Sequence, residues 1–352
     1  MALRLLESAL ASGEVAHAYL FYGPSGVGKR TVAYRFGAAL ASGGDRSAED
    51  RALRGLHPDF DEIEPEGQFT TIGQVRELVR KAASRPFEGA RRVFVLRADT
   101  LNVQAANALL KTLEEPEGAA VFILLALSRE GVLPTVVSRA QAVRFDPVPM
   151  GEIFSFLTQR GHSEGVARLA AALGRGSVGL ALRYAEEDEL GELREAVFRT
   201  GFAFDGSFEE RYGAVEQIVA RAEEVGAARE KAYLATYPDA DRGPDRRVKE
   251  TAKRLRRAAR DGAVAEALGL LALLYRDAAV VAAGAPELAA NTDRMEEIQA
   301  RVQERPGADW AGVARVLGEA SASLAYNISP EAILEVALSR TRQKVLGVSP
   351  DS

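Results

Sequence analysis

A glycine-rich segment near the N-terminus, Gly23–Lys29, joins a short apolar run to a helical pattern. The run His17–Tyr22 has the length and composition of a buried strand, and Lys29–Leu40 repeats apolar residues at helical spacing. In such a context, glycines let backbone N–H groups turn toward an anion, while the helix N-terminus and Lys29 add positive charge. An ordinary glycine-rich turn is the alternative, but the strand–loop–helix order is that of the Walker A phosphate loop. The segment therefore predicts a phosphate-loop fold.

Apolar runs and helical patterns alternate through residues 1–147. Further strands are expected at 57–63, 92–96, 120–126 and 142–145, with helices at 72–83 and 102–113. Because apolar strands alternating with helices are typical of parallel sheets, we predict an α/β domain with a mostly parallel five-stranded sheet and helices on both faces.

The strand-like runs stop after Pro147-Val-Pro149. The remaining patterns are helical and are interrupted by glycines and prolines. We therefore expect a small helical domain over 148–200, a larger all-helical domain over 201–346 and a frayed tail at 347–352.

Composition excludes several classes of protein. The 352 residues include no cysteine, which rules out disulfides, thiolate zinc sites and iron–sulfur clusters, and the three histidines are too scattered to suggest a metal site. A net charge of −5 excludes a basic nucleic-acid coat, so any DNA contact would use a local patch. The N-terminal segment carries Glu7 and Glu14 within its apolar pattern, which indicates an amphipathic helix rather than a secretion signal. Since no apolar stretch is long enough to span a membrane, we expect a cytoplasmic protein.

Two elements that hold Mg²⁺ in phosphate-loop ATPases are altered. The loop lysine is followed by Arg30 instead of Ser or Thr, and Thr31 is turned away by about 100° of helix. The strand at 92–96 ends in Leu96 and Arg97, where an acidic pair is expected. Asp99 is either a remnant of that pair or an acidic residue favoured near a helix N-terminus, and we favour the second. We expect no hydrolysis at this site and no bound metal, although the loop could still hold ATP or ADP. Its candidate phosphate-binding residues are Gly23, Gly26, Gly28, Lys29, Arg30 and Thr31.

Five strings occur in one order along the first domain: His17-Ala-Tyr-Leu-Phe21, Gly23–Lys29, His57-Pro-Asp-Phe60, Asn107–Pro116 and Leu133–Arg139. Together they resemble subunits of the bacterial DNA polymerase III clamp loader, which belong to the AAA+ group. Farther along, Gly176–Gly179 resembles the lid domain of these proteins, while Tyr275-Arg-Asp277 and Asn327–Pro330 weakly resemble their collar. The resemblance implies an AAA+ α/β domain followed by a small helical lid domain and an all-α collar domain for oligomerisation, over the ranges given above.

Two kinds of clamp-loader subunit carry these strings. The gamma and tau motor subunits have intact Walker A and acidic Walker B elements, whereas delta prime-type subunits have a degenerate site and keep the Ser-Arg element. Arg30, Leu96 and Arg97 place this sequence with the delta prime type, as does Leu180, which stands where active relatives have an arginine that touches the nucleotide.

The delta prime type implies a set of partners and a cellular place. The chain would be a subunit without intrinsic ATPase activity in a five-subunit ring with gamma/tau and delta subunits, within the DNA polymerase III holoenzyme. The ring would load the sliding clamp onto primed DNA, so this chain would contact the clamp indirectly and DNA without sequence specificity. It would need no cofactor and no membrane, and would lie in the cytoplasm with the replisome at the nucleoid.

Arg139, which follows Ser138, is the residue with the strongest candidate chemical role. In the resembling family this arginine projects into the nucleotide site of the neighbouring motor subunit and acts as an arginine finger in trans. The alternative is a surface arginine in a salt bridge worth about 0–1 kcal/mol. The surrounding strings favour the finger.

The sequence departs from the family at two places. Ala41–Leu56 replaces a four-cysteine zinc module and has no cysteine, so zinc is excluded, and what replaces the module is left open. Ala140 stands where the family's Ser-Arg-Cys element has its cysteine, which should be harmless because the arginine carries the charge.

Other readings stay open. The chain could be an active gamma/tau-like ATPase, or a sensor that binds nucleotide without hydrolysis. Asn107 and Lys111 share a helix face that either docks a partner or DNA phosphate or is ordinary surface. The basic segment 242–260 is either a patch for an anionic partner or, as we favour, a solvated helix face. His57 is expected to be a hydrogen-bonded histidine and not a catalyst.

Overall fold

The computed structural model describes residues 2–65, 69–115, 118–202, 207–237, 246–323 and 330–346. The chain divides into two compact units, one of residues 1–153 with 175–179 and the other of residues 154–174 with 180–352. The three-domain division at residues 147 and 200 stays a prediction. The predicted tail at 347–352 and the Asn327–Ser329 part of the collar-like string lie outside the described residues.

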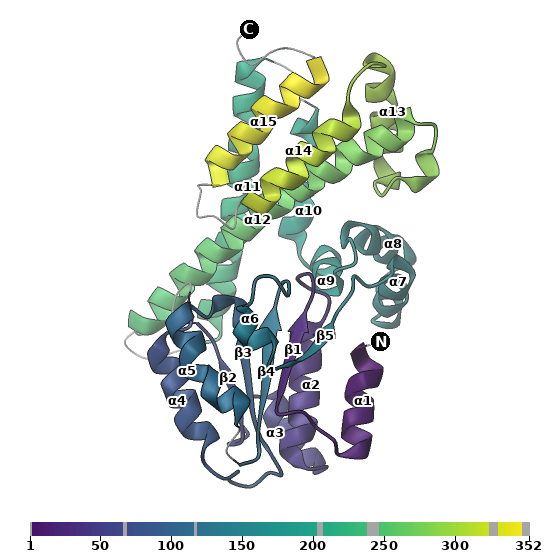
Figure 1. The fold of residues 1–352 in the computed structure, drawn as a ribbon. Coiled ribbons are helices and arrows are strands. Elements are labelled where there is room, and N and C mark those ends of the chain that lie inside the picture. Colours follow the sequence, from purple (N-terminus) through teal and green to yellow (C-terminus); the bar gives the residue numbers. More distant parts are fainter. Residues whose placement is uncertain are drawn as a thin grey trace. The chain divides into compact units, whose positions relative to one another are not determined.

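The first unit contains a five-stranded parallel sheet in the order β2–β3–β4–β1–β5 (Figure 1). Its strands are β1 (Ala18–Tyr22), β2 (Phe60–Ile63), β3 (Arg92–Arg97), β4 (Ala120–Ala126) and β5 (Gln141–Arg144). In the register of the three adjacent strands, Leu20 of β1 lies opposite Leu124 of β4 and Ala142 of β5. The predicted fold class, a parallel five-stranded α/β sheet followed by helices, is confirmed.

Helices cover both faces of this sheet (Figure 1). One face packs against α1 (Ala2–Ser12), α2 (Lys29–Ser42) and α3 (Arg46–Leu53), and the other against α4 (Ile72–Ala82), α5 (Val103–Glu114) and α6 (Pro134–Val137). Side chains of a strand alternate between faces, so Tyr19 and Phe21 enter the first core while Ala18 and Leu20 enter the second. β4 is buried along its whole length, which explains its uninterrupted apolar sequence.

Local sequence signals place α2 and α5. Asn102 caps α5 as predicted, since its Oδ1 accepts a hydrogen bond from the N–H of Ala105 at 2.8 Å. On α2, a methyl group at Gly37 would lie within 3 Å of the side chains of Phe60 and Val93. A glycine is therefore needed where α2 crosses the sheet, and this close approach fixes the helix that follows the phosphate loop.

The second unit is helical. Its elements, of which α7 and α9 begin in the first unit, are α7 (Met150–Gln159), α8 (Glu164–Leu173), α9 (Val178–Glu186), α10 (Asp188–Gly201), α11 (Phe208–Ala235), α12 (Arg246–Ala282), η3 (Pro286–Leu288), η4 (Thr292–Arg294), α13 (Met295–Glu304), α14 (Trp310–Ser323) and α15 (Pro330–Leu346). One apolar core, which includes Leu193, Ile218, Leu271 and Trp310, joins α8 through α15. No described helix is both long enough and apolar enough to cross a membrane.

The Tyr275-Arg-Asp277 string has a structural role in this unit. Asp277 is fully buried and accepts hydrogen bonds from the backbone and side-chain N–H groups of Asn291, both at 2.8 Å. The side-chain oxygen of Asn291 in turn accepts a bond from Arg194, which pairs with Asp293 at 2.8 Å. Tyr275 donates its hydroxyl to the carbonyl of the last residue of α10. The string thus ties α12 to the segment before α13 and to α10.

Candidate functional site

The glycine-rich loop leads from β1 into α2, as predicted, and closes on its own lysine. Gly26 and Gly28 have φ angles of 74° and 95°, which glycine adopts at little cost. Lys29 is only 9% exposed, and its Nζ donates to the carbonyl oxygens of Gly23 and Pro24, both at 2.6 Å. The Lys29 ammonium group, which would bind a phosphate, therefore donates its hydrogen bonds to the loop itself.

The Gly176–Gly179 string packs against this loop within the first unit. The N–H of Gly179 donates to the carbonyl oxygen of Gly26 at 3.0 Å. A methyl group at Gly26 would lie 1.9 Å from Oγ of Ser177, so the two chain segments are in direct contact. A phosphate entering the loop would have to displace Lys29 from two carbonyl oxygens beside this contact.

The two residues after the loop lysine do not line a phosphate site. Arg30 forms ion pairs with Glu62 of β2 and, at 3.2 Å, with Glu64 just after this strand. Its guanidinium carbon lies 5.4 Å from the centre of the Tyr34 ring. Thr31 is exposed. The position that holds Mg²⁺ in working loops thus serves to connect α2 with the edge strand.

We expect the Arg30→Ala substitution to lower the free energy of unfolding by no more than about 1 kcal/mol, because exposed ion pairs contribute little. The Arg30 side chain is 59% exposed despite its two carboxylate partners. Urea unfolding of the variant and of Arg35→Ala, an exposed arginine of the same helix, should give similar values. A loss above about 2 kcal/mol would show that the ion pairs of Arg30 stabilise the fold and are more than surface contacts.

The end of β3 lacks the acidic pair, as the sequence predicts. Leu96 is buried, and Arg97 pairs with Asp99 at 3.1 Å. Asp99 lies in the first turn of the short helix η1 (Ala98–Thr100) and also accepts a hydrogen bond from the N–H of Leu127 after β4. Burial lowers the pKa of Lys29, while Asp99 raises it and Arg97 lowers it. Asp99 therefore holds strand ends together, and the structure finds no cluster of three or more metal-ligating side chains among the residues it describes.

Arg139 lies directly after α6 and Ser138, with its side chain 31% exposed. One terminal nitrogen, NH1, donates to the carbonyl of Thr135 at 2.9 Å and to Oγ of Ser138 at 3.1 Å. The other, NH2, forms an ion pair with Glu114, the last residue of α5. This group borders an open depression of about 590 Å³ lined by His17, Leu113, Glu114, Ser138, Arg139 and Ala140. The structure thus brings together two strings that are distant in sequence, and Glu114 is the residue that sequence reasoning missed.

The His57-Pro-Asp59 string is structural. The fully buried carboxylate of Asp59 accepts hydrogen bonds from the three backbone N–H groups of Phe87–Gly89, at 2.7–2.9 Å. Burial alone would raise the pKa of Asp59, but these donors outweigh it and hold the pKa below its usual value. His57 is buried, and its Nδ1 accepts the N–H of Asp59 at 3.1 Å. The expectation of a hydrogen-bonded histidine agrees with this geometry.

The stretch that replaces the zinc module, Ala41–Leu56, is built around α3. Asp45 caps this helix by accepting two backbone N–H groups. Arg51 pairs with Glu88 at 2.6 Å, which joins α3 to the segment that Asp59 holds. Helix capping and an ion pair to a distant segment therefore hold this stretch.

The weaker candidates are on the surface. Asn107 and Lys111 are exposed on α5.

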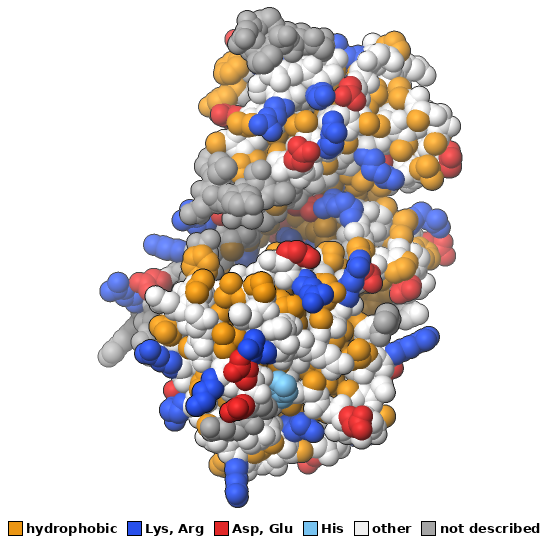
Figure 2. Space-filling view, in the orientation of Figure 1, with side chains coloured by type: hydrophobic (Ala, Val, Ile, Leu, Met, Phe, Trp, Pro, Cys, Tyr) orange, Lys and Arg blue, Asp and Glu red, His pale blue; other side chains and the backbone are white. Residues whose placement is uncertain are grey.

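In the basic segment 242–260, Arg256 and Arg260 pair with Glu223 of α11 at 3.3 and 3.1 Å. Residues 242–245 lie outside the described part. On the face shown in Figure 2, basic, acidic and apolar side chains are interspersed, with no continuous patch of one charge among the side chains that are drawn in colour. The pairing agrees with a solvated helix face.

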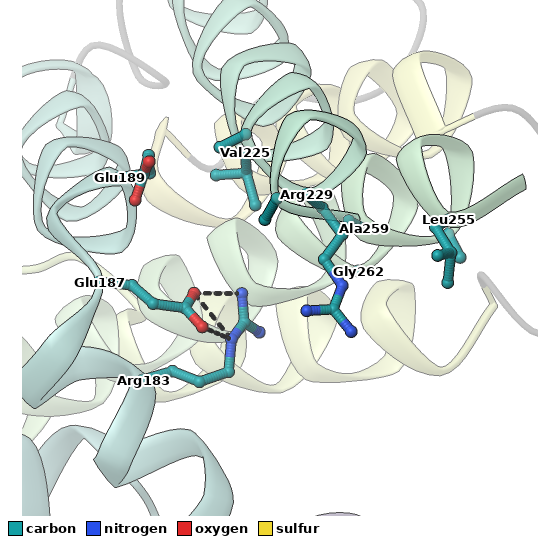
Figure 3. A pocket seen from close by; sticks show the side chains of 11 residues that line it. Arg183, Glu187, Glu189, Val225, Arg229, Leu255, Ala259 and Gly262 are labelled. Atoms are coloured by element: carbon teal, nitrogen blue, oxygen red, sulfur yellow. Dashed lines mark hydrogen bonds and ion pairs between the residues drawn. The ribbon is translucent and has the colours of Figure 1, made fainter. Parts of the chain in front are cut away.

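A cavity of about 570 Å³ lies within the second unit, bordered by α9 to α12 (Figure 3). Arg183 pairs with Glu187 at 2.9 Å on one side, and Arg229 lies on α11 on the other. Small residues such as Ala259 and Gly262 form much of the rest of the lining. Because no nucleophile stands beside a base here, the cavity is not a candidate active site.

Comparisons with known proteins agree with this arrangement. Residues 1–149 match the family model described as DNA polymerase III, delta subunit. The chain is 43% identical over 135 residues to DNA polymerase III subunit delta' of Pseudomonas aeruginosa, an alignment that covers 35% of this chain and 41% of that protein. It is 29% identical over 205 residues to the Bacillus subtilis subunit delta', covering 56% and 62%. The chain thus spans about two-fifths to three-fifths of the length of these curated relatives.

Proteins named for the tau and gamma subunits are also similar. Subunit tau of Bacillus subtilis is 32% identical over 152 residues, which is 41% of this chain and 26% of that protein. A solved Thermotoga maritima protein related to the DNA polymerase III gamma subunit covers 96% of this chain and 99% of its own, at 18% identity and a TM-score of 0.46. The family model over residues 1–149 and the delta' relatives agree with the resemblance to clamp-loader subunits that the five strings carry.

Proposed function

We propose that this chain is a non-hydrolysing ring subunit of the replicative clamp loader and that Arg139 completes the ATP site of a neighbouring motor subunit. The observation that carries this proposal is a contrast between two sites in the first unit. Lys29 is bound to carbonyl groups of its own loop, whereas the Arg139 guanidinium is partly exposed beside an open depression. The lysine of the chain's own loop is thus already hydrogen-bonded within the loop, whereas Arg139 is accessible.

The chemistry of Arg139 fits such a role. Guanidinium stays charged at any physiological pH, is planar and presents several N–H donors to phosphate oxygens. An arginine supplied from a neighbouring subunit stabilises the charge that develops on the γ-phosphate as it is transferred. In this proposal gamma/tau subunits supply the nucleotide, the delta subunit completes the ring, and the ring places the sliding clamp on primed DNA through sequence-independent contacts.

The two alternatives make different demands on the loop. An active gamma/tau-like ATPase needs metal ligands where Arg30, Leu96 and Arg97 stand. A nucleotide sensor needs only the loop, but phosphate would have to release Lys29 from its two carbonyl partners. In both alternatives, phosphate binding would have to compete with the two carbonyl groups that now accept from Lys29.

The test combines catalysis and assembly. The purified chain with Mg-ATP should show no turnover above background, and a fluorescent ATP analogue should not bind to it. Mixed with gamma/tau and delta subunits, it should co-elute as one complex with DNA-stimulated ATPase activity. Turnover by the isolated chain that Lys29→Ala abolishes would establish a motor instead. Binding of the analogue without turnover would establish the sensor, and failure to assemble would refute the ring role.

A further inference from the structure

We propose that Glu114 is a positioning residue for Arg139: its carboxylate fixes the guanidinium in the orientation that the neighbouring nucleotide site requires. This inference rests on the proposed function. Glu114 does not itself reach the reacting atoms in this proposal, and it acts through the ion pair with Arg139.

The contacts of Arg139 come from three different places. The carbonyl oxygen of Thr135 and the hydroxyl of Ser138 hold NH1, and the carboxylate of Glu114 holds NH2. Nε is buried without a hydrogen-bond partner. Both NH1 contacts come from residues within four positions of Arg139, so they connect the guanidinium only to its own turn of the chain. Glu114, from the end of α5, is the contact that fixes NH2.

Glu114 is not explained by the stability of its own helix. It ends α5, where the helix dipole disfavours negative charge, and Glu115 follows it directly. Within the residues that the structure describes, Glu115 forms no ion pair, whereas Glu114 is paired with Arg139. An acidic residue at this unfavourable position is accounted for by the arginine that it holds.

The ion pair orients Arg139 without blocking it. The NH2 group carries two N–H bonds, so one can point to a phosphate oxygen while the other stays bound to the carboxylate. An arginine that is already oriented loses less side-chain freedom when it meets the phosphate. Both side chains remain accessible, with Arg139 31% and Glu114 46% exposed. Glu114 should therefore raise the rate at which a correctly placed finger acts and leave nucleotide affinity unchanged.

The experiment uses the complex reconstituted with gamma/tau and delta subunits. Its reference is the Arg139-dependent turnover, defined as the kcat of the wild-type complex minus that of the complex with Arg139→Ala. Glu114→Ala should reduce this quantity by about fivefold or more with unchanged KM for ATP. Glu114→Gln keeps an acceptor oxygen and should cause a smaller loss, of about twofold. Glu115→Ala removes the neighbouring carboxylate, which has no ion pair within the described residues, and should have no effect.

A second measurement tests the positioning apart from catalysis. In the isolated chain, ¹⁵N relaxation of the Arg139 Nε–Hε group should show faster motion in Glu114→Ala than in wild type or in Glu115→Ala. If Glu114→Ala leaves the Arg139-dependent turnover undiminished, or leaves the motion of the Arg139 guanidinium unchanged, the positioning role of Glu114 is overturned. If Arg139→Ala itself leaves the turnover of an assembled complex unchanged, the proposed function fails, and the relaxation measurement still reports whether Glu114 restrains the arginine.

Discussion

Arg139→Ala should lower ATP turnover at the neighbouring motor site by about 10³-fold or more, which is the range found when arginine fingers are supplied to other nucleotide hydrolases. The loss should appear in kcat and not in KM, because the guanidinium meets charge that develops in the transition state. Ring assembly should be unchanged, since the side chain is partly exposed and its partners within the chain are Glu114, Thr135 and Ser138. The measurement is DNA-stimulated ATPase of the reconstituted complex, with assembly followed by size exclusion.

Two further variants sharpen this result. Arg139→Lys keeps a positive charge but not the planar donor arrangement, so it should recover only a small part of the rate. Arg144→Ala removes an exposed arginine of β5 that pairs with Asp146, and it should leave turnover at the wild-type level. An assembled complex that turns over ATP normally with Arg139→Ala would remove the trans role from this residue.

Asp59→Ala should lower the free energy of unfolding of the first unit by about 3 kcal/mol, because it leaves buried N–H donors without an acceptor. Asp59 is fully buried and accepts three backbone N–H groups from Phe87–Gly89. Asp59→Asn keeps the shape and one acceptor oxygen, so its loss should be smaller. Asp50→Ala removes an exposed carboxylate that pairs with Arg54, and should cost less than about 1 kcal/mol.

The two units can be followed separately during unfolding. The chain has one tryptophan, Trp310, which is buried in the second unit. Its fluorescence reports that unit, whereas circular dichroism reports both. Asp59→Ala should shift the part of the dichroism transition that occurs without a fluorescence change. A shift in the Trp310 transition alone would contradict the assignment of this carboxylate to the stability of the first unit.

The effect of Asp59 should depend on pH in a defined direction. The backbone donors outweigh burial and hold the folded-state pKa of Asp59 below its ordinary value, which is about 3.9 in unfolded chains. Its stabilising contribution is therefore fully present above about pH 4 and is lost as pH falls through the folded-state pKa. The stability difference between wild type and Asp59→Ala should shrink below about pH 4 and stay constant from there to neutral pH.

Much of the first unit could be predicted because its local signals are strong. The uninterrupted apolar run at 120–126 is β4 to the residue, and Asn102 begins α5 as its capping role predicts. The second predicted strand starts later, at Phe60, because His57 and Asp59 use their hydrogen-bonding groups on each other and on Phe87–Gly89. That partner segment is about 30 residues away, and nothing in local periodicity points to it.

The chain's own sequence determined the parallel α/β fold and the altered phosphate loop, because strand length, helix spacing and short motifs are local properties. Arg139 became the strongest candidate only through the resemblance to clamp-loader subunits that the five strings carry. The tertiary structure alone decided that Lys29 binds its own loop, that Arg30 reaches Glu62 on β2 and that Glu114 holds Arg139. Each of the last two contacts joins residues more than 20 positions apart. The physical reason is that an ion pair or a buried hydrogen bond depends on where packing brings the partners, and no spacing along the chain specifies that.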